Sequence, residues 1–289
     1  MHGQAIALGT PQPARVIPEL GEVGRVDLDQ VARIPGVPSV DFFRGVEKRL
    51  LEVGELRGWM PCFYYDASAV TAVFAADAAA LARLLPSPAL RPLRLGPRTG
   101  AIAFTAFEYR VTDIGPYNEF AISIPVQVGC GLNPPVLPLL WQMLRGQLHV
   151  FVWQLPVTTE IARVGGVEVY NYPKFLADLP FERGPDEACA AIVHEGRTEL
   201  TLIGKALATR PGRSVVQHSH SVKDGHVFDA AVRVNPLEHA RSREPFAARL
   251  LLGDGPIADR LREVGIGRLL SYEYLPKLQL ILPAAERVG

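Results

Sequence analysis

The chain has 289 residues, of which 48% are hydrophobic, and this is enough for one large core in a single β-rich domain. The 30 basic and 30 acidic residues cancel, and neither sign forms a run of five or six. This charge pattern predicts a mixed surface and excludes the basic footprint expected of a nucleic-acid-binding protein.

Cysteine usage and apolar runs bear on the compartment. The three cysteines are widely separated and odd in number, so they predict no disulfide framework and favour a reducing, cytoplasmic setting. The first residues lack the basic start and apolar core of an export signal. The most apolar stretch, 134–156, is interrupted by prolines and by Arg145, so we expect a buried helix followed by a strand and no membrane span.

The N-terminal part differs in pattern from the rest. Prolines punctuate the first forty residues, and apolar residues then recur near helical spacing over 40–56. We therefore expect residues 1–60 to be an extension ending in one amphipathic helix, and residues 61–289 to be the main domain. A second, short helix is predicted within 75–85, where Asp77 can cap the first turn and Pro86 ends it.

From Gly100 onward the pattern is that of strands. Short apolar segments alternate with Gly, Pro, Asp or Asn, at 100–111, 120–128, 149–155, 199–208, 214–222, 226–234, 248–253 and 271–283. This arrangement predicts a mainly β, α+β fold built on an antiparallel barrel or sandwich.

Lys174 is one of five lysines and stands in the aromatic and aliphatic run EVYNYPKFLADLPF. Desolvation disfavours the charged ammonium form and so increases the fraction of free amine able to attack a carbonyl. Lysine side chains also commonly reach from an apolar surface to water, so the residues alone do not decide between a nucleophile and a solvated cation.

Four segments resemble the acetoacetate decarboxylase family in the family's own order. They are a helix-and-proline segment, ALARLLPSPAL at 80–90; GPYNE at 115–119; EVYNYPK at 168–174; and the closing strand YLPKLQLILPAAERV. The resemblance covers roughly residues 61–289 and implies a barrel-like catalytic domain with a few peripheral helices.

The resemblance implies roles for individual residues. It places the Schiff-base nucleophile on Lys174 and an acidic partner on Glu119. Tyr117, Tyr172, Glu168 and Glu108 are further candidates for contact with the substrate, although tyrosines at such positions are often structural. It implies no metal or cofactor, and it suggests a homo-oligomer.

Three departures from the family pattern weaken the expectation of decarboxylation. The family's decarboxylases carry a second lysine after the nucleophile, where this chain has Phe175. They carry an arginine in the strand before the proline helix, but residues 66–75 contain none. A further glutamate of the family falls near Phe104 or Thr105. Extra sequence at about 132–146 is expected to reshape the pocket, cover it, or form a subunit contact.

Other chemistries have weaker support. His218 and His220 share one face of a predicted strand, but without a third ligand we read them as an ordinary solvent-facing or hydrogen-bonded pair. The chain has no G-x-S-x-G elbow and no G-x-G-x-x-G or P-loop motif, so hydrolysis by a serine nucleophile and nucleotide binding are not indicated.

The sequence therefore predicts a Schiff-base enzyme acting on a ketone or keto acid, of the decarboxylase or the aldolase and dehydratase type. The alternative is a non-catalytic protein that binds a small apolar molecule in the same barrel and uses Lys174 only for its charge.

Overall fold

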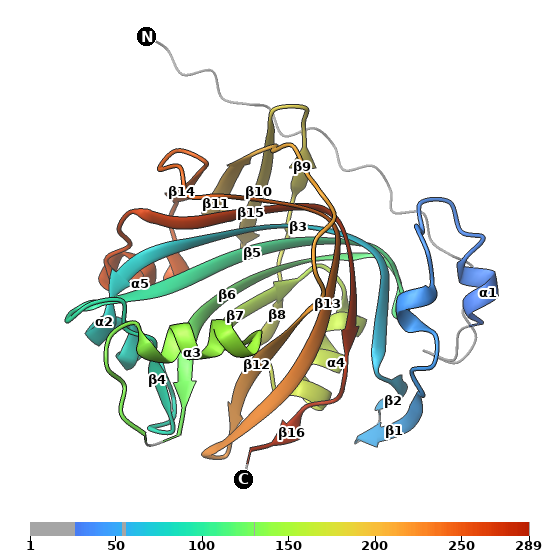
Figure 1. The fold of residues 1–289 in the computed structure, drawn as a ribbon, viewed down its shortest axis with the longest axis horizontal. Coiled ribbons are helices and arrows are strands. Elements are labelled where there is room, and N and C mark those ends of the chain that lie inside the picture. The colour runs from blue at the N-terminus through green and yellow to red at the C-terminus, as the bar shows by residue number, and fades with distance from the viewer. Residues whose placement is uncertain (1–26, 54–55, 130, 289) are drawn as a thin grey trace.

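A computed structural model describes residues 27–53, 56–129 and 131–288 (Figure 1). Its centre is a closed barrel of seven strands in the order β3, β15, β13, β12, β7, β6 and β5, with β5 returning to β3 and the β6–β7 pairing closing the ring. The strands are β3 (Cys62–Asp77), β5 (Thr99–Thr112), β6 (Tyr117–Val128), β7 (Gln147–Val157), β12 (Val215–Lys223), β13 (His226–Ser242) and β15 (Leu269–Leu282). Neighbours are antiparallel except β7 and β12, which run parallel.

Shorter strands extend and cover this barrel. A second antiparallel sheet has the order β14, β11, β10 and β9, while three short strands pair with β6, β7 and β13. The second sheet comprises β9 (Phe181–Arg183), β10 (Glu187–His194), β11 (Arg197–Lys205) and β14 (Ala248–Leu252); the added strands are β4 (Leu90–Pro92), β8 (Lys174–Leu176) and β16 (Glu286–Arg287).

The two faces of the barrel wall bury different cores because successive side chains of a strand point to opposite sides. On the outer face, apolar side chains such as Phe104, Phe120 and Ile122 pack against Ile192 and Leu200 of the second sheet. The inner core lies on the opposite face of the wall from the second sheet and draws on six of the seven ring strands. Its buried members are Cys62, Tyr64, Ala67, Ala69, Tyr109, Tyr117, Val157, Ala162, Leu275, Leu278 and Leu280, and Val232 and Val234 pack against them.

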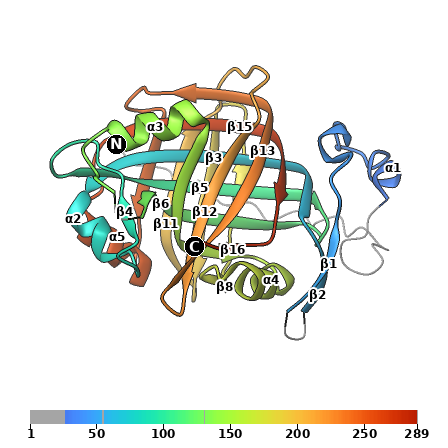
Figure 2. The same ribbon diagram turned by 60° about the horizontal axis from the view of Figure 1, so that its bottom comes forward.

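Four helices surround or enter this framework, namely α2 (Ala78–Arg83), α3 (Leu137–Arg145), α4 (Glu160–Tyr170) and α5 (Pro256–Val264). The predicted helix within 75–85 is confirmed as α2, and the Asp77 side chain accepts the Ala80 N–H at 2.8 Å as its N-cap. Helix α4 contributes Ala162 to the inner core and Tyr170 to the core beside it, so it closes one end of the barrel (Figure 2).

The prediction of an amphipathic helix over 40–56 is wrong. The described residues instead form a 3₁₀ turn, Asp41–Phe43, followed by a hairpin of β1 (Arg49–Val53) and β2 (Leu56–Met60). Gly45 takes φ +75°, a left-handed conformation in which the helix cannot continue, so only one turn forms. Helix α1 (Leu28–Val31) lies earlier, and Val31, Val40 and Phe43 pack on Phe63, Tyr65, Val111 and Ile281 of the barrel wall.

All eight predicted strands are present, and the mainly β barrel class is confirmed. The helix and strand expected in 134–156 are also present as α3 and β7, but α3 is not buried as expected. Of its nine residues only Gln142 is buried, because the helix lies on the surface and contacts mainly β7. The sequence analysis predicted neither α4 nor α5.

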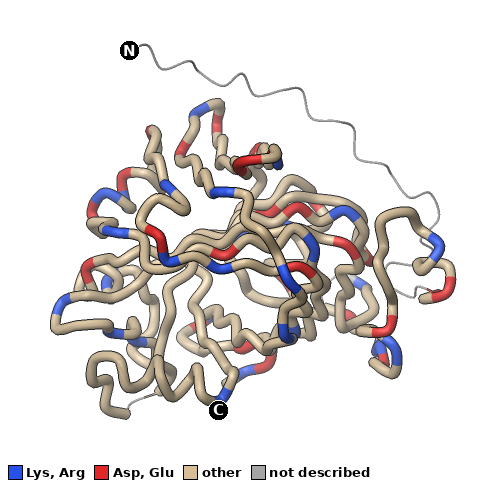
Figure 3. The backbone as a smooth tube through the Cα atoms, turned by 45° about the horizontal axis from the view of Figure 1, so that its top comes forward, with Lys and Arg blue, Asp and Glu red and all other residues tan. Residues whose placement is uncertain are grey.

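Basic and acidic residues are interspersed along the backbone in Figure 3, in keeping with the balanced composition. Within the described ranges, no helix has both the length and the apolar character needed to cross a membrane.

Candidate active site

Lys174 and Glu119 meet inside the barrel. Lys174 opens β8, which pairs in parallel with β7 at Leu155, and Glu119 lies on β6 opposite Val157 of the same strand. The Lys174 Nζ donates to Glu119 Oε2 at 2.7 Å, and the two side chains are only 5% and 10% exposed. Two residues 55 positions apart thus form a buried ion pair because β8 and β6 flank β7 on opposite sides.

Helix α4 and the turn after it position Lys174. The helix ends at Tyr170, the next residue Asn171 turns the chain with a left-handed φ of 54°, and Pro173 precedes β8. Gly166 of α4 faces the lysine, since a Cβ built there would lie 2.1 Å from Lys174 Cδ. The absence of a side chain at Gly166 therefore lets the helix lie directly on the aliphatic part of Lys174 and hold it toward Glu119.

Tyrosines enclose the ion pair. The Tyr109 hydroxyl donates to Glu119 Oε1 at 3.2 Å, and the Tyr64 and Tyr117 hydroxyls share a 2.9 Å hydrogen bond. The Lys174 Nζ lies 5.7 Å from the centre of the Tyr117 ring. Burial raises the pKa of Tyr64, Tyr109 and Tyr117 well above the ordinary value of 10, so these phenols stay protonated at neutral pH.

Cys62 lies in the same interior, where burial first and the charge of Asp113 second raise the pKa of its thiol to about 12. A thiol of this kind is not a nucleophile near neutral pH, because the reactive species is the thiolate. Lys174 is therefore the side chain of this interior best suited to covalent chemistry.

The six predicted site residues are only partly brought together. Tyr117 lies beside the Lys174–Glu119 pair. Tyr172 is buried and stacks on Tyr170 with ring centres 5.4 Å apart, and its carbonyl accepts the Lys174 N–H at 2.8 Å. Its side chain thus packs between helix and barrel while its backbone helps to fix the lysine.

The two remaining glutamates lie outside the barrel interior. Glu168 is exposed on the outer side of α4. Glu108 pairs with Asn118 across β5 and β6, so it faces away from Glu119, and it forms ion pairs with Arg110 at 2.6 Å and Arg183 at 3.0 Å. The structure therefore does not bring Glu168 or Glu108 together with Lys174, because of the side of the helix or strand each occupies.

Sequence reasoning missed Tyr64, Tyr109 and Gly166. A signal for Tyr109 was available, since the Gly115–Pro116 turn joins the two strands that carry Tyr109 and Tyr117, and these residues pair directly. For Gly166 the signal was the Gly pair before the lysine segment. Tyr64 comes from β3, and only the closed barrel reveals its position.

The His218 and His220 pair is hydrogen-bonded and not solvent-facing. His218 Nδ1 lies 2.6 Å from Asp229 Oδ2, and His220 Nε2 lies 2.9 Å from Nδ1 of His149. The His149 and His218 rings stack with centres 4.4 Å apart. Across the described part of the chain, no group of three or more His, Cys, Asp and Glu side chains has the arrangement needed to hold a metal ion.

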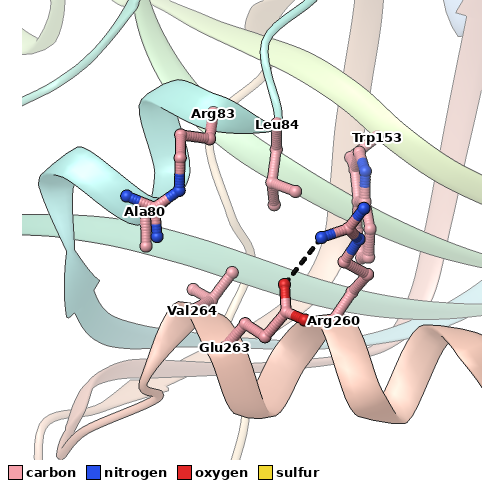
Figure 4. Close-up of a pocket in the computed structure, with 7 residues that line it drawn as sticks. All are labelled: Ala80, Arg83, Leu84, Trp153, Arg260, Glu263 and Val264. Atoms are coloured by element: carbon pink, nitrogen blue, oxygen red, sulfur yellow. Dashed lines mark hydrogen bonds and ion pairs between the residues drawn. The ribbon is translucent and has the colours of Figure 1, made fainter.

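A cavity of about 290 Å³ lies elsewhere, between α2, α5 and β7 (Figure 4). Its wall is formed by Ala80, Arg83, Leu84, Trp153, Arg260, Glu263 and Val264. None of these residues belongs to the inner core, so this cavity is separate from the lysine and glutamate pair.

The arrangement of Lys174 and Glu119 can support amine chemistry. A carboxylate at hydrogen-bonding distance can take a proton from the ammonium group and leave a free amine in the buried interior. The surrounding neutral phenols can donate hydrogen bonds to an oxygen atom of a bound molecule.

Comparison with known proteins agrees with this fold. The family model of acetoacetate decarboxylase matches residues 54–275. A solved structure described as acetoacetate decarboxylase superposes with a TM-score of 0.61 at 18% identity, over 79% of this chain and 89% of that one. The acetoacetate decarboxylase of Legionella pneumophila gives 0.59 at 15% identity, over 89% and 97%.

A third structure is the enduracididine biosynthesis enzyme MppR, in complex with the condensation product of pyruvate and imidazole 4-carboxaldehyde. It superposes with a TM-score of 0.55 at 14% identity, over 78% of this chain and 88% of that one. No curated protein matches the sequence. Because the family model spans well over half of the residues, the chain belongs to the acetoacetate decarboxylase family.

Proposed function

We propose that the protein is a lyase in which Lys174 forms a Schiff base with a ketone or keto acid and Glu119 transfers protons. The observation that carries this proposal is the 2.7 Å contact between a buried lysine amine and a buried carboxylate in the barrel interior. Membership of a family that includes decarboxylases supports the same chemistry.

In the proposed reaction, Glu119 first accepts a proton from the Lys174 ammonium group. The free amine adds to the substrate carbonyl, and the resulting carbinolamine takes the proton back from Glu119 as its hydroxyl leaves as water. The product is an iminium ion beside a carboxylate. This cation then draws the electron pair of a neighbouring bond to give a neutral enamine. Where a C–C bond breaks, a β-keto acid loses carbon dioxide and the enamine carbon takes a proton; where a C–H bond breaks, the Glu119 carboxylate takes the proton and the enamine carbon adds to an aldehyde, whose oxygen then takes that proton. Each route regenerates an iminium, and its hydrolysis by water releases the product and the lysine.

The groups around the Lys174 amine bear on the type of reaction and on the substrate. The described contacts of the Lys174 side chain are with Glu119, the Tyr117 ring and Gly166, none of which is a cation. The charge of a second lysine is missing because Phe175 holds that position. An aldol-type or dehydration reaction therefore suits the site at least as well as loss of carbon dioxide. That MppR has been solved with pyruvate bound is consistent with a keto acid as the substrate.

The test is reductive trapping. The protein is incubated with acetoacetate, pyruvate and further α- and β-keto acids, reduced with borohydride, and mapped by peptide mass spectrometry. We expect a substrate-dependent adduct on the peptide containing Lys174, its loss in K174R, and its retention in K205R, which changes an exposed lysine at the end of β11. Carbon dioxide release and aldehyde consumption, measured with the same substrates, separate the two reaction types.

An intact protein that gives no adduct with any member of the panel would favour the non-catalytic binding alternative. An adduct that persists in K174R would move the nucleophile to another lysine.

A further inference from the structure

Helix α3 presents its apolar side to solvent. Leu137, Leu140, Trp141 and Leu144 follow the spacing i, i+3, i+4 and i+7, which places them in one stripe along the helix. All four are exposed, and Leu144 is 83% accessible. The opposite side of the helix holds the buried Gln142, whose amide donates to Val126 O and whose Oε1 accepts the His149 N–H. The helix is thus anchored by its polar side.

The apolar surface extends beyond the helix. Leu132 and Val136 precede α3, Met143 lies on it, and Leu148 follows it at the start of β7. Val215 opens β12, where β12 and β7 pair in parallel. We call these nine residues, 132, 136, 137, 140, 141, 143, 144, 148 and 215, the α3 patch. It holds nine of the 14 large hydrophobic side chains exposed in the described part of the chain.

The size of the α3 patch is that of an interface. Nine large side chains exposed to this extent present on the order of 1,000 Å² of apolar surface, whereas the largest patch on a typical monomer is about 300–600 Å². A stable contact between two proteins buries about 800 Å² on each partner. In Figures 1 and 2, no other element of the described chain lies over the outer side of α3.

The charges of the α3 patch select the kind of partner. Across residues 131–148 the only Lys, Arg, Asp or Glu is Arg145, whose guanidinium lies 4.3 Å from the Trp141 ring. A helix that lies on a lipid surface carries Lys and Arg along its polar side, and α3 does not. Because the apolar stripe itself carries no charge, it can face an identical stripe without opposing like charges.

We propose that the α3 patch is the contact between two copies of this chain, related by a twofold axis that passes near Leu140 and Trp141. In such an isologous contact the two α3 helices run antiparallel, so Leu137 meets Leu144 of the partner subunit and Leu144 meets Leu137 of the partner subunit. The contact buries the stripe that the fold of a single chain leaves exposed.

The test measures mass in solution by sedimentation equilibrium at tens of micromolar. The wild-type protein should show an even multiple of the chain mass of 31.5 kDa. The variants L144E and L137K should each show half the wild-type mass with an unchanged circular dichroism spectrum, because the replaced side chains are exposed. The control F246E replaces a side chain that is 84% exposed far from the α3 patch in sequence, and it should keep the wild-type mass.

The double variant L137K/L144E tests the antiparallel arrangement. It brings the two introduced charges of opposite sign together at both ends of the contact, so it should recover the wild-type mass. The proposal is overturned by a single-chain mass for the wild-type protein, by an L144E variant that keeps the wild-type mass, or by a double variant that stays dissociated. Co-flotation of a monomeric wild-type protein with vesicles of phosphatidylcholine and phosphatidylserine would instead assign the patch to a lipid surface.

Discussion

Lys174 and Glu119 depend on each other because both lie almost fully out of water. Removing one member of a buried ion pair leaves the other charge without compensation and typically costs about 3–5 kcal/mol. We expect K174M and E119Q each to lower the free energy of unfolding by roughly this amount. The double variant should lose much less than the sum of the two, since no isolated charge remains.

Urea unfolding of the four proteins measures this coupling. If the two losses simply add, the residues do not interact in solution and the pair is not the organising contact of the interior.

Gly166 and Gly165 give a matched pair of substitutions in α4. A Cβ at Gly166 would collide with the side chain of Lys174, whereas a Cβ at Gly165 meets nothing within 4 Å. We expect G166A to lower the melting temperature and to reduce the rate of borohydride trapping at least tenfold. G165A should be neutral or slightly stabilising, because alanine is favoured over glycine within a helix by about 1 kcal/mol.

A G166A variant with wild-type trapping would show that the lysine does not need the close approach of the helix. Differential scanning calorimetry and the trapping assay together separate loss of the fold from loss of lysine position.

The three interior tyrosines make the protein sensitive to alkali. Burial raises the pKa of Tyr64, Tyr109 and Tyr117 in the folded state, while in the unfolded chain each ionises near the ordinary value of 10. Their contribution to stability is complete below pH 10 and is lost as pH rises above it, since only the unfolded state then releases the protons. Urea unfolding from pH 8 to 11 should show this fall, and Y64F/Y117F should reduce it. An equal dependence of the unfolding free energy on pH in Y64F/Y117F would show that other groups cause the fall.

At the scale of the elements, β7 and β12 carry the stacked histidines, with Asp229 of β13 beside them. Burial first, and then the charges of His218 and His220, lower the pKa of His149 from 6.5 to about 4, and burial also lowers the pKa of His220. As pH falls from 6.5 to about 4, the unfolded state binds protons that the folded state does not bind, so the free energy of unfolding decreases.

We expect the free energy of unfolding to fall between pH 6.5 and 4, and H149F to reduce the slope while keeping the ring stack. The measurement is urea unfolding at a series of pH values. An unchanged slope in H149F would show that His149 is already charged or exposed in the folded protein.

Apolar periodicity predicted some elements well and misled on others. Eight of the strands from β5 onward were predictable because they are apolar segments bounded by turn residues, whereas β8, β9, β10 and β16 were not predicted. Residues 40–56 have helical spacing, but Gly45 stops the helix and the apolar residues of β1 and β2 pair across a hairpin. Helix α4 was not predicted because glycine has a low helix propensity and the segment contains both Gly165 and Gly166. The packing of Gly166 on Lys174, which sequence does not display, is what requires a glycine at this point.

For the whole molecule, the barrel class was predictable and its closure was not. The β6–β7 pairing joins strands on either side of α3, and the second sheet gathers β14 with β9, β10 and β11 from distant parts of the chain. Lys174 and Glu119 were paired in advance only through the family resemblance, since a spacing of 55 residues carries no geometric signal. The tyrosines around them required the three-dimensional arrangement.

The boundary expected at residue 60 crosses a buried polar contact. Asp113 lies at the end of β5, accepts the Phe63 N–H and the Tyr65 hydroxyl, and forms an ion pair with Lys48. Burial raises the pKa of Asp113 and the charge of Lys48 opposes that rise. A fragment that begins at residue 61 would lose this cation and also the Phe43 ring packed on Phe63, 4.9 Å between centres. Protease cleavage before Cys62 would therefore leave a remainder that is less stable than the parent, because Phe43 and Lys48 lie on the removed side of the cut.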